Sequence, residues 1–176
     1  MNPWHDVPPG DIPKSFNVVV EIPKGSRNKY ELDPVTGLLS LDRTLYSPVY
    51  YPGDYGFIPQ TLWYDGDPLD VLVLSTNPVY PLTLLKARPI GVIQMIDNSQ
   101  KDHKVLAVPL NDPNFKEIRK LADVPKHRLL EIRHFFNIYK ELQKIKCNVV
   151  KLQGKKDAQK TIQTAVKLYL KKYGHK

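Results

Sequence analysis

The sequence of 176 residues predicts an α+β fold, in which a small closed or nearly closed β-barrel carries helices on its outside. Strand patterning dominates to about residue 115, and helix patterning follows with no Gly/Ser linker, repeat or low-complexity tract between them. The length fits one domain with a hydrophobic core, and 41% apolar with 25% charged residues is a globular composition. We therefore expect residues 1–176 to form a single domain.

The first strand and the first hairpin are predicted near the N-terminus. Residues 16–22 form a β-branched run that Pro23 closes. Residues 29–33 and 38–43 flank the turn-forming residues 34–37, and this pattern predicts a hairpin.

Four further strands are predicted along the chain. Residues 71–74 form a short, wholly apolar strand. Residues 85–96 and 104–110 flank a polar connection at 97–103 and predict a second hairpin. Residues 146–152 are expected to add a late strand.

Residues 46–68 contain too many breakers for a helix or a central strand, so we expect an ordered loop system there. The breakers are Pro48, Pro52, Gly53, Gly56, Pro59, Gly66 and Pro68.

Two helices are predicted after the strands. One covers residues 125–142, with Asp123 or Val124 near its N-cap, and the other covers residues 157–173, with Asp157 as N-cap. Each has one apolar face to bury against the barrel. The residues of these faces are Leu129, Ile132, Phe136, Tyr139 and Leu142 in the first helix, and Ile162, Ala165, Tyr169 and Tyr173 in the second.

The net charge of +8 is confined to the C-terminal segment. Residues 140–176 carry eleven lysines against Glu141 and Asp157, a net charge of +9, whereas the rest of the chain carries 15 basic and 16 acidic residues, a net charge of −1. The part with motif-like spacing is thus nearly neutral, which is not typical of a DNA-binding face. A solvated helix face is the simpler interpretation of the lysines.

Neither export nor a membrane span is expected. No apolar run approaches the length of a bilayer span, and residues 1–10 contain His5, Asp6 and three prolines where a signal peptide needs a basic start and an apolar stretch. Cys147 is the only cysteine, so neither an intrachain disulfide nor a cysteine-based zinc site can form. We expect a cytoplasmic protein whose metal ligands are oxygen or imidazole.

The most informative run is Asp65-Gly66-Asp67-Pro68-Leu69-Asp70, which leads directly into the strand predicted at 71–74. Glycine and proline hold its backbone in a turn, so three carboxylates stay crowded and their repulsion favours bound cations. Oxygen ligands on a rigid turn suit Mg²⁺, which also accepts phosphate oxygens. The simpler alternative is a solvent-exposed or calcium-stabilised acidic turn. An EF-hand is excluded because Thr76 stands where its bidentate glutamate belongs.

Further carboxylates are expected at the same end of the sheet. Asp97 and Asp102 flank the connection of the second hairpin, and Lys104 shares the side of the strand on which Asp102 lies. Glu21 lies in the first strand. An aspartate pair on a hairpin is more often turn chemistry than a ligand set. Together with the 65–70 run, however, it gives five aspartates near strand ends, which are difficult to keep folded without metal.

A second group of side chains is cationic and phenolic. Antiparallel pairing in the first hairpin would bring Lys29 and Arg43 roughly opposite each other. Each member has an ordinary explanation as a surface charge or an amphipathic tyrosine. Carboxylate-held cations that face such donors nevertheless suit a small, highly charged phosphate ester or anhydride. The members are Lys29, Arg43, Tyr51, Tyr55, Tyr139 and Lys140.

Seven short motifs occur in order over about residues 18–142. They are Val19-Val20-Glu21-Ile22-Pro23, Lys29-Tyr30-Glu31, Asp42-Arg43, residues 51–59, residues 65–71, Asp97 with Asp102 and Lys104, and His134-Phe135-Phe136 with Tyr139-Lys140. One acidic hexapeptide can arise by chance, but an ordered set does so far less readily. The set closely resembles the soluble family I inorganic pyrophosphatases, of the short prokaryotic type.

The resemblance implies an OB-like, strongly twisted barrel of five main strands with two main helices outside. It also implies hydrolysis of pyrophosphate to two orthophosphates by Mg²⁺-assisted attack of a metal-bridged water or hydroxide. Several Mg²⁺ ions per active site are implied, with Mn²⁺, Zn²⁺ or Co²⁺ as substitutes. By motif position the metal ligands are Asp65, Asp70, Asp97, Asp102 and, through water, Glu21. Asp67 is the general base and acts with Lys29, Arg43 and Tyr55. The substrate-binding residues are Lys29, Arg43, Tyr55, Lys104, Tyr139 and Lys140.

The resemblance implies a homohexamer built from two trimers, with pyrophosphate as the small-molecule partner, no nucleic acid and no membrane. Two other interpretations stay open. A small oligonucleotide-binding barrel with a basic tail would stack bases on its tyrosines, but it leaves the aspartates unexplained. A catalytically silent, metal-stabilised barrel shares every predicted element, and only an activity assay separates it from an enzyme.

Overall fold

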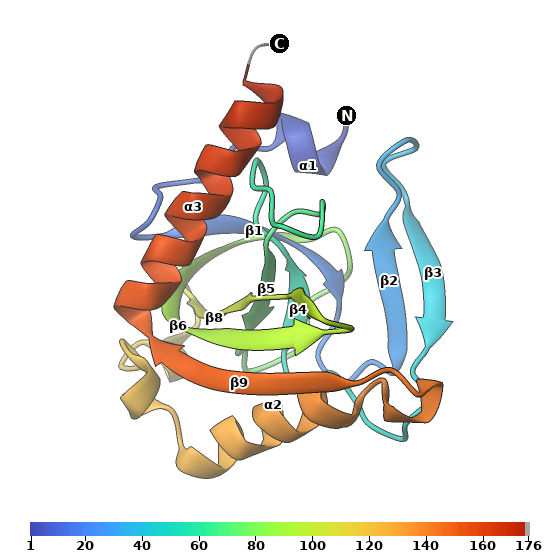
Figure 1. The fold of residues 1–176 in the computed structure, drawn as a ribbon. Helices are drawn as coiled ribbons and strands as arrows, with labels where there is room; N and C mark the ends of the chain where they lie inside the picture. Colours follow the sequence, from blue (N-terminus) through green and yellow to red (C-terminus); the bar gives the residue numbers. More distant parts are fainter. Residues whose placement is uncertain (175–176) are drawn as a thin grey trace.

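The computed structural model describes residues 1–174, and its centre is a closed barrel of five strands (Figure 1). The strands follow one another in the order β1, β4, β5, β8 and β6, and β6 pairs back with β1. All neighbours are antiparallel except β5 and β8, which are parallel. The barrel strands are β1 (Phe16–Ile22), β4 (Asp54–Phe57), β5 (Asp70–Val73), β6 (Leu84–Asp97) and β8 (Lys104–Pro109).

Strand β6 has 14 residues and pairs with two further strands, β7 (Gln100–Lys101) at its last residues and β9 (Cys147–Gly154) from Gly91 to Asp97. A separate two-stranded sheet, β2 (Asn28–Leu32) and β3 (Leu39–Thr44), stands beside the barrel (Figure 1). Both hairpins and the late strand are therefore confirmed, with ends shifted by one or two residues. Lys29 and Arg43 are register partners across β2 and β3, as predicted.

The prediction of loop throughout residues 46–68 is wrong at β4, which is buried and central. Gly56 pairs with Val20, and a Cβ at this position would collide with the carbonyl oxygen of Val19. Glycine is therefore required here because the backbones of β1 and β4 approach closely. A glycine in the sequence more often indicates a loop, which is why the strand was not predicted.

The two main helices, α2 (Lys126–Ile138) and α3 (Lys155–Tyr173), cover the outside of the barrel (Figure 1). On β5, Leu72 packs in the cluster that contains Ile132 of α2. Val71 and Val73 pack in the cluster that contains Ile162 of α3. Because successive side chains of a strand point to opposite faces, β5 contributes apolar side chains both to the cluster under α2 and to the cluster under α3. The remaining helical turns are α1 (Pro3–Asp6), η1 (Pro113–Phe115), η2 (Leu121–Asp123) and η3 (Glu141–Gln143).

The predicted helix bounds need two corrections. The first helix ends at Ile138, because the backbone of Lys140 leaves the helical conformation while its side chain turns to Asp97. Leu142, expected on the buried face, is 61% exposed for this reason. The second helix begins at Lys155, and its N-cap is Gly154 and not Asp157. Asp157 lies in the first turn, where its negative charge interacts favourably with the helix dipole.

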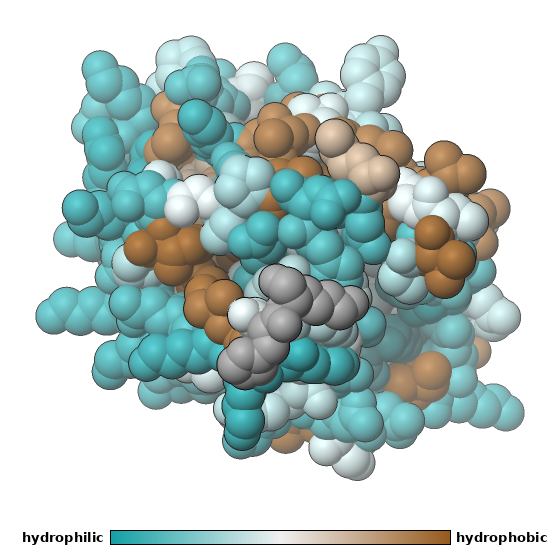
Figure 2. All heavy atoms as spheres, turned by 90° about the horizontal axis from the view of Figure 1, so that it is seen from above, coloured by the Kyte–Doolittle hydropathy of each residue, from teal (hydrophilic) through white to brown (hydrophobic). Residues whose placement is uncertain are grey.

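The end of the barrel toward α1 is hydrophilic over most of the face that Figure 2 shows, with apolar residues in separate small patches. Within residues 1–174, no helix combines the length and the apolar character that crossing a membrane requires.

Candidate active site

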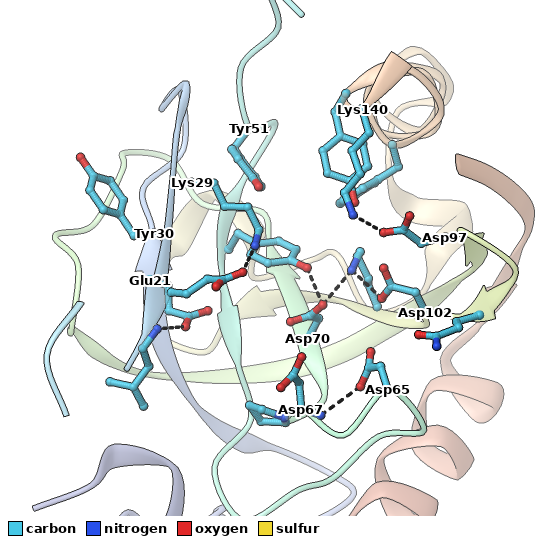
Figure 3. Close-up of a pocket in the computed structure, with 18 of the residues that line it drawn as sticks. Glu21, Lys29, Tyr30, Tyr51, Asp65, Asp67, Asp70, Asp97, Asp102 and Lys140 are labelled. Carbon is cyan, nitrogen blue, oxygen red and sulfur yellow. Dashed lines mark hydrogen bonds and ion pairs between the residues drawn. The ribbon is translucent and has the colours of Figure 1, made fainter. Parts of the chain in front are cut away.

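A cavity of about 490 Å³ lies where the β2–β3 hairpin, the acidic loop (residues 65–70) and the C-terminal end of α2 meet (Figure 3). It gathers eleven of the twelve residues that the motifs single out, although they come from segments far apart in the sequence. These residues are Glu21, Lys29, Tyr55, Asp65, Asp67, Asp70, Asp97, Asp102, Lys104, Tyr139 and Lys140. The twelfth, Arg43, is not among the lining residues.

Lys104 lies between two of the predicted metal ligands. Its Nζ is 2.7 Å from Asp70 Oδ2 and 2.7 Å from Asp102 Oδ1, so these two oxygens lie at most twice 2.7 Å, or 5.4 Å, apart. The expected convergence of Asp70 and Asp102 is therefore confirmed. Burial alone would lower the pKa of Lys104, but both carboxylates outweigh it and hold that pKa well above its usual value. The Tyr55 hydroxyl donates to the same Asp70 oxygen at 2.5 Å.

A second ion pair joins Lys140, just after α2, to Asp97 at the end of β6. The Lys140 ammonium lies 5.4 Å from the centre of the Tyr139 ring. Cys147 donates its thiol proton to Asp97 at 3.4 Å, and it is the register partner of Asp97 across β6 and β9. Burial, with the charge of Asp97, raises the pKa of this thiol to about 12. This contact could not be predicted from the sequence, because only the pairing of β6 with β9 reveals it.

The acidic loop is held by its own backbone. Asp67 N–H donates to Asp65 Oδ1 at 3.1 Å, and Gly66 adopts φ +99°, which favours glycine. Burial raises the pKa of Asp65 to about 6, and the charges of Asp70 and Asp102 add to this rise. Burial, followed by the charge of Asp70, also raises the pKa of Asp67. Crowded carboxylates on a turn are therefore observed, as the sequence predicts.

Glu21 connects the barrel to the β2–β3 hairpin. This β1 residue is 9% exposed, and its Oε1 accepts the backbone N–H of Leu32 at 2.8 Å. Burial raises its pKa to about 8 even though that hydrogen bond favours the charged form.

The cations of the hairpin have acidic partners that the sequence analysis did not assign. Lys29 pairs with Glu31 and with Asp42, and Arg43 pairs with Asp42. The signal was the pairing of β2 with β3, because Lys29 lies two residues from Glu31 along β2 and opposite Arg43, the neighbour of Asp42, on β3. Tyr51 also lines the cavity and is only 2% exposed, so it serves the hydrophobic core as well.

The donor set fits hard divalent cations. All seven carboxylates that line the cavity offer oxygen, and burial of several of them raises their pKa values, so a bound cation would relieve the cost of their charge. Within the described part of the chain, however, no three carboxylate, imidazole or thiol groups surround one point closely enough to hold an ion. Instead, the ammonium group of Lys104 lies between Asp70 and Asp102, and that of Lys140 pairs with Asp97.

The fold and the cavity together define a class of protein: a small barrel enzyme whose acidic cavity suits hard cations and a phosphate-rich substrate. The family model described as inorganic pyrophosphatase matches residues 18–170. The chain is 47% identical over 173 residues to soluble inorganic pyrophosphatase 2 of Chlamydomonas reinhardtii, covering 98% of this chain and 90% of that protein.

Solved structures agree with this comparison. The inorganic pyrophosphatase of Thermus thermophilus superposes with a TM-score of 0.92 at 40% identity, over 96% of this chain and 99% of that one. The type I inorganic pyrophosphatase of Toxoplasma gondii does so with a TM-score of 0.87 at 28% identity, over 97% and 88% of the two chains. The chain belongs to the inorganic pyrophosphatase family, whose metal-dependent members hydrolyse pyrophosphate to phosphate. The family and the OB-like barrel inferred from the motifs are thereby confirmed.

Proposed function

We propose that Mg²⁺ is the metal with which this chain hydrolyses pyrophosphate, and that Asp65, Asp70, Asp97 and Asp102 bind it, with Glu21 acting through water. The observation that carries the proposal is that all five of these carboxylates line one cavity. Bound Mg²⁺ would neutralise phosphate charge and lower the pKa of the attacking water. Mn²⁺, Zn²⁺ and Co²⁺ are the substitutes to compare.

Asp67 acts as the general base in this proposal. Its carboxylate takes a proton from the attacking water, the water oxygen bonds to one phosphorus, and the bond from that phosphorus to the bridging oxygen breaks. The second phosphate leaves with the bridging oxygen. The raised pKa of Asp67 supports the assignment, because a base works best when its pKa approaches the working pH.

The phosphate-binding role falls to the cations and phenols around the cavity. Their charges and hydroxyl donors would hold the phosphate oxygens and stabilise the charge that develops on the leaving group. Arg43 is included although it does not line the cavity, since it lies opposite Lys29 on the hairpin. The set is Lys29, Arg43, Tyr55, Lys104, Tyr139 and Lys140.

Phosphate release from pyrophosphate tests the proposal directly. Metal-free protein should release almost no phosphate, and added Mg²⁺ should restore release by orders of magnitude. The absence of release with Mg²⁺, together with salt-dependent binding of single-stranded nucleic acid, would favour the oligonucleotide-binding interpretation instead.

We also propose that the single domain assembles in the cytoplasm as a homohexamer of two trimers. Exposed apolar side chains support an assembly: Tyr80 is 87% exposed, Leu84 53% and Leu82 45%. Light scattering coupled to size-exclusion chromatography should give the mass of six chains, whereas the mass of one chain would refute the assembly.

A further inference from the structure

The N-terminal segment reaches the cavity, although no motif assigns it a role. Trp4 in α1 lines the cavity, as does Pro34 at the tip of the β2–β3 hairpin. In Figure 1, α1 lies between this tip and the C-terminal end of α3. We propose that residues 2–4 form a brace that fixes the hairpin against the acidic loop, and that Asn2 is a positioning residue for Lys29 and Arg43.

The β2–β3 hairpin depends on such contacts because it is a separate two-stranded sheet, and within residues 1–174 no strand pairing joins it to the barrel. An isolated two-stranded hairpin is at best marginally stable. Its base is held by the N–H of Tyr51, which donates to Ser26 O at 2.9 Å, and the end of β2 is held by the Glu21–Leu32 hydrogen bond. Lys29 and Arg43 lie on this hairpin, so their positions depend on how firmly it is held.

The tip of the hairpin is held by the brace. Asn2 Nδ2 donates to the carbonyl oxygen of Pro34 at 2.9 Å. Gly37, at φ +71°, lies so near the carbonyl of Met1 that an added Cβ would be 2.9 Å from its oxygen. The N-terminal chain is therefore packed against the tip as well as hydrogen-bonded to it.

The other end of the brace is bonded to the chain that enters the acidic loop. The indole N–H of Trp4 donates to Thr61 O at 2.8 Å, and Trp4 is 8% exposed. Thr61 Oγ1 in turn accepts the N–H of Leu69 at 2.9 Å, one residue before Asp70. Within the brace, Trp4 N–H donates to Asn2 Oδ1 at 3.0 Å. The brace thus connects the β2–β3 hairpin, which carries Lys29 and Arg43, to the acidic loop at residues 65–70.

Loosening the brace should weaken substrate binding rather than the chemical step. A mobile hairpin must be ordered when pyrophosphate binds, and that cost raises KM while kcat stays nearly constant. The inference rests on the proposed phosphate-binding role of Lys29 and Arg43.

Asn2→Ala tests the inference, because it removes the hydrogen bond to Pro34 and the one to Trp4. We expect KM for pyrophosphate to rise about fivefold, as the loss of the one hydrogen bond that reaches the hairpin predicts, with kcat within about twofold. The backbone amides of the hairpin, such as that of Leu32, should exchange hydrogen faster, a readout independent of activity. Val35→Ala, at a side chain 91% exposed on the same tip, is the matched control and should change neither KM nor the rate of hydrogen exchange in the hairpin.

A mutant cycle tests whether the brace acts through Lys29 and Arg43. In a Lys29→Ala/Arg43→Ala background, Asn2→Ala should change KM by less than about twofold. An unchanged KM in Asn2→Ala, or an equal rise in KM with and without these two side chains, would overturn the inference. A normal KM in Lys29→Ala alone would instead overturn the proposed role of Lys29. Trp4→Phe, which keeps the aromatic ring and loses the hydrogen bond to Thr61, should raise KM in the same direction.

Discussion

Replacing Lys104 by methionine removes the ammonium group that neutralises Asp70 and Asp102 at the base of the cavity. The Lys104 side chain is 3% exposed, and the two carboxylate side chains are 26% and 14% exposed. Removing one partner of a buried ion pair costs about 3–5 kcal/mol, because an uncompensated charge stays behind. Because the Asp70 side chain stays partly exposed, water can screen its charge in the variant. We therefore expect the free energy of unfolding of the metal-free variant to fall by about 3 kcal/mol, the lower end of that range.

Urea unfolding in EDTA, at one fixed protein concentration, measures this loss. The slope against urea should match that of the wild type, so that the midpoint reports stability alone. Mg²⁺ should stabilise the variant more than the wild type, because no ammonium group then competes for the two carboxylates. Glu131→Gln, which removes a half-exposed partner of Arg128, is the matched control and should cost less than about 1 kcal/mol. A loss below about 1 kcal/mol for Lys104→Met would refute the buried bridge.

Three further outcomes follow from the structure. In metal-free protein, Glu21 has a pKa of about 8 when folded against 4.5 when unfolded, so between these values the folded chain keeps a proton that the unfolded chain releases. The free energy of unfolding should therefore fall as the pH rises from about 4.5 to 8, by at most about 1.4 kcal/mol per pH unit. In urea titrations at several pH values, Glu21→Gln should show a smaller fall of this free energy with pH. Gly56→Ala should lower the free energy of unfolding by about 1–3 kcal/mol or more by forcing β1 and β4 apart. Gly154→Ala, with open space at its Cβ, should cost less than about 1 kcal/mol. Equal losses of the two variants in thermal unfolding would contradict the close approach of β1 and β4 at Gly56. Asp67→Asn should lower kcat about 10²–10⁴-fold in a phosphate-release assay while Mg²⁺ affinity changes little, and wild-type release across pH would exclude Asp67 as the base.

Most of the fold could be predicted because local patterns and tertiary structure agree. The apolar run of β5 and the turn formers between β2 and β3 each specify one conformation. Two features could not be predicted. Gly56 serves a contact between distant strands, and the end of α2 is set by the pairing of Lys140 with Asp97, so neither is encoded in its own neighbourhood.

The candidate site was predictable to the extent that its residues belong to recognisable motifs. Spacing alone placed Lys104 beside Asp102, and hairpin register placed Lys29 opposite Arg43. The contact of Cys147 with Asp97 and the lining role of Trp4 depend on pairings between the ends of the chain and its middle. The binding and catalytic roles of the individual residues stay predictions.

We propose above that the carboxylates of the cavity bind several divalent ions. Electron paramagnetic resonance of Mn²⁺, a stand-in for Mg²⁺, counts the ions bound by metal-free protein without any catalytic readout. We predict more than one Mn²⁺ per chain in the wild type, fewer in Asp70→Asn, and no change in Asp11→Asn, whose aspartate is exposed and does not line the cavity. A wild-type chain that binds no Mn²⁺, or an Asp70→Asn variant that binds as many ions as the wild type, would show that these carboxylates do not form the metal site.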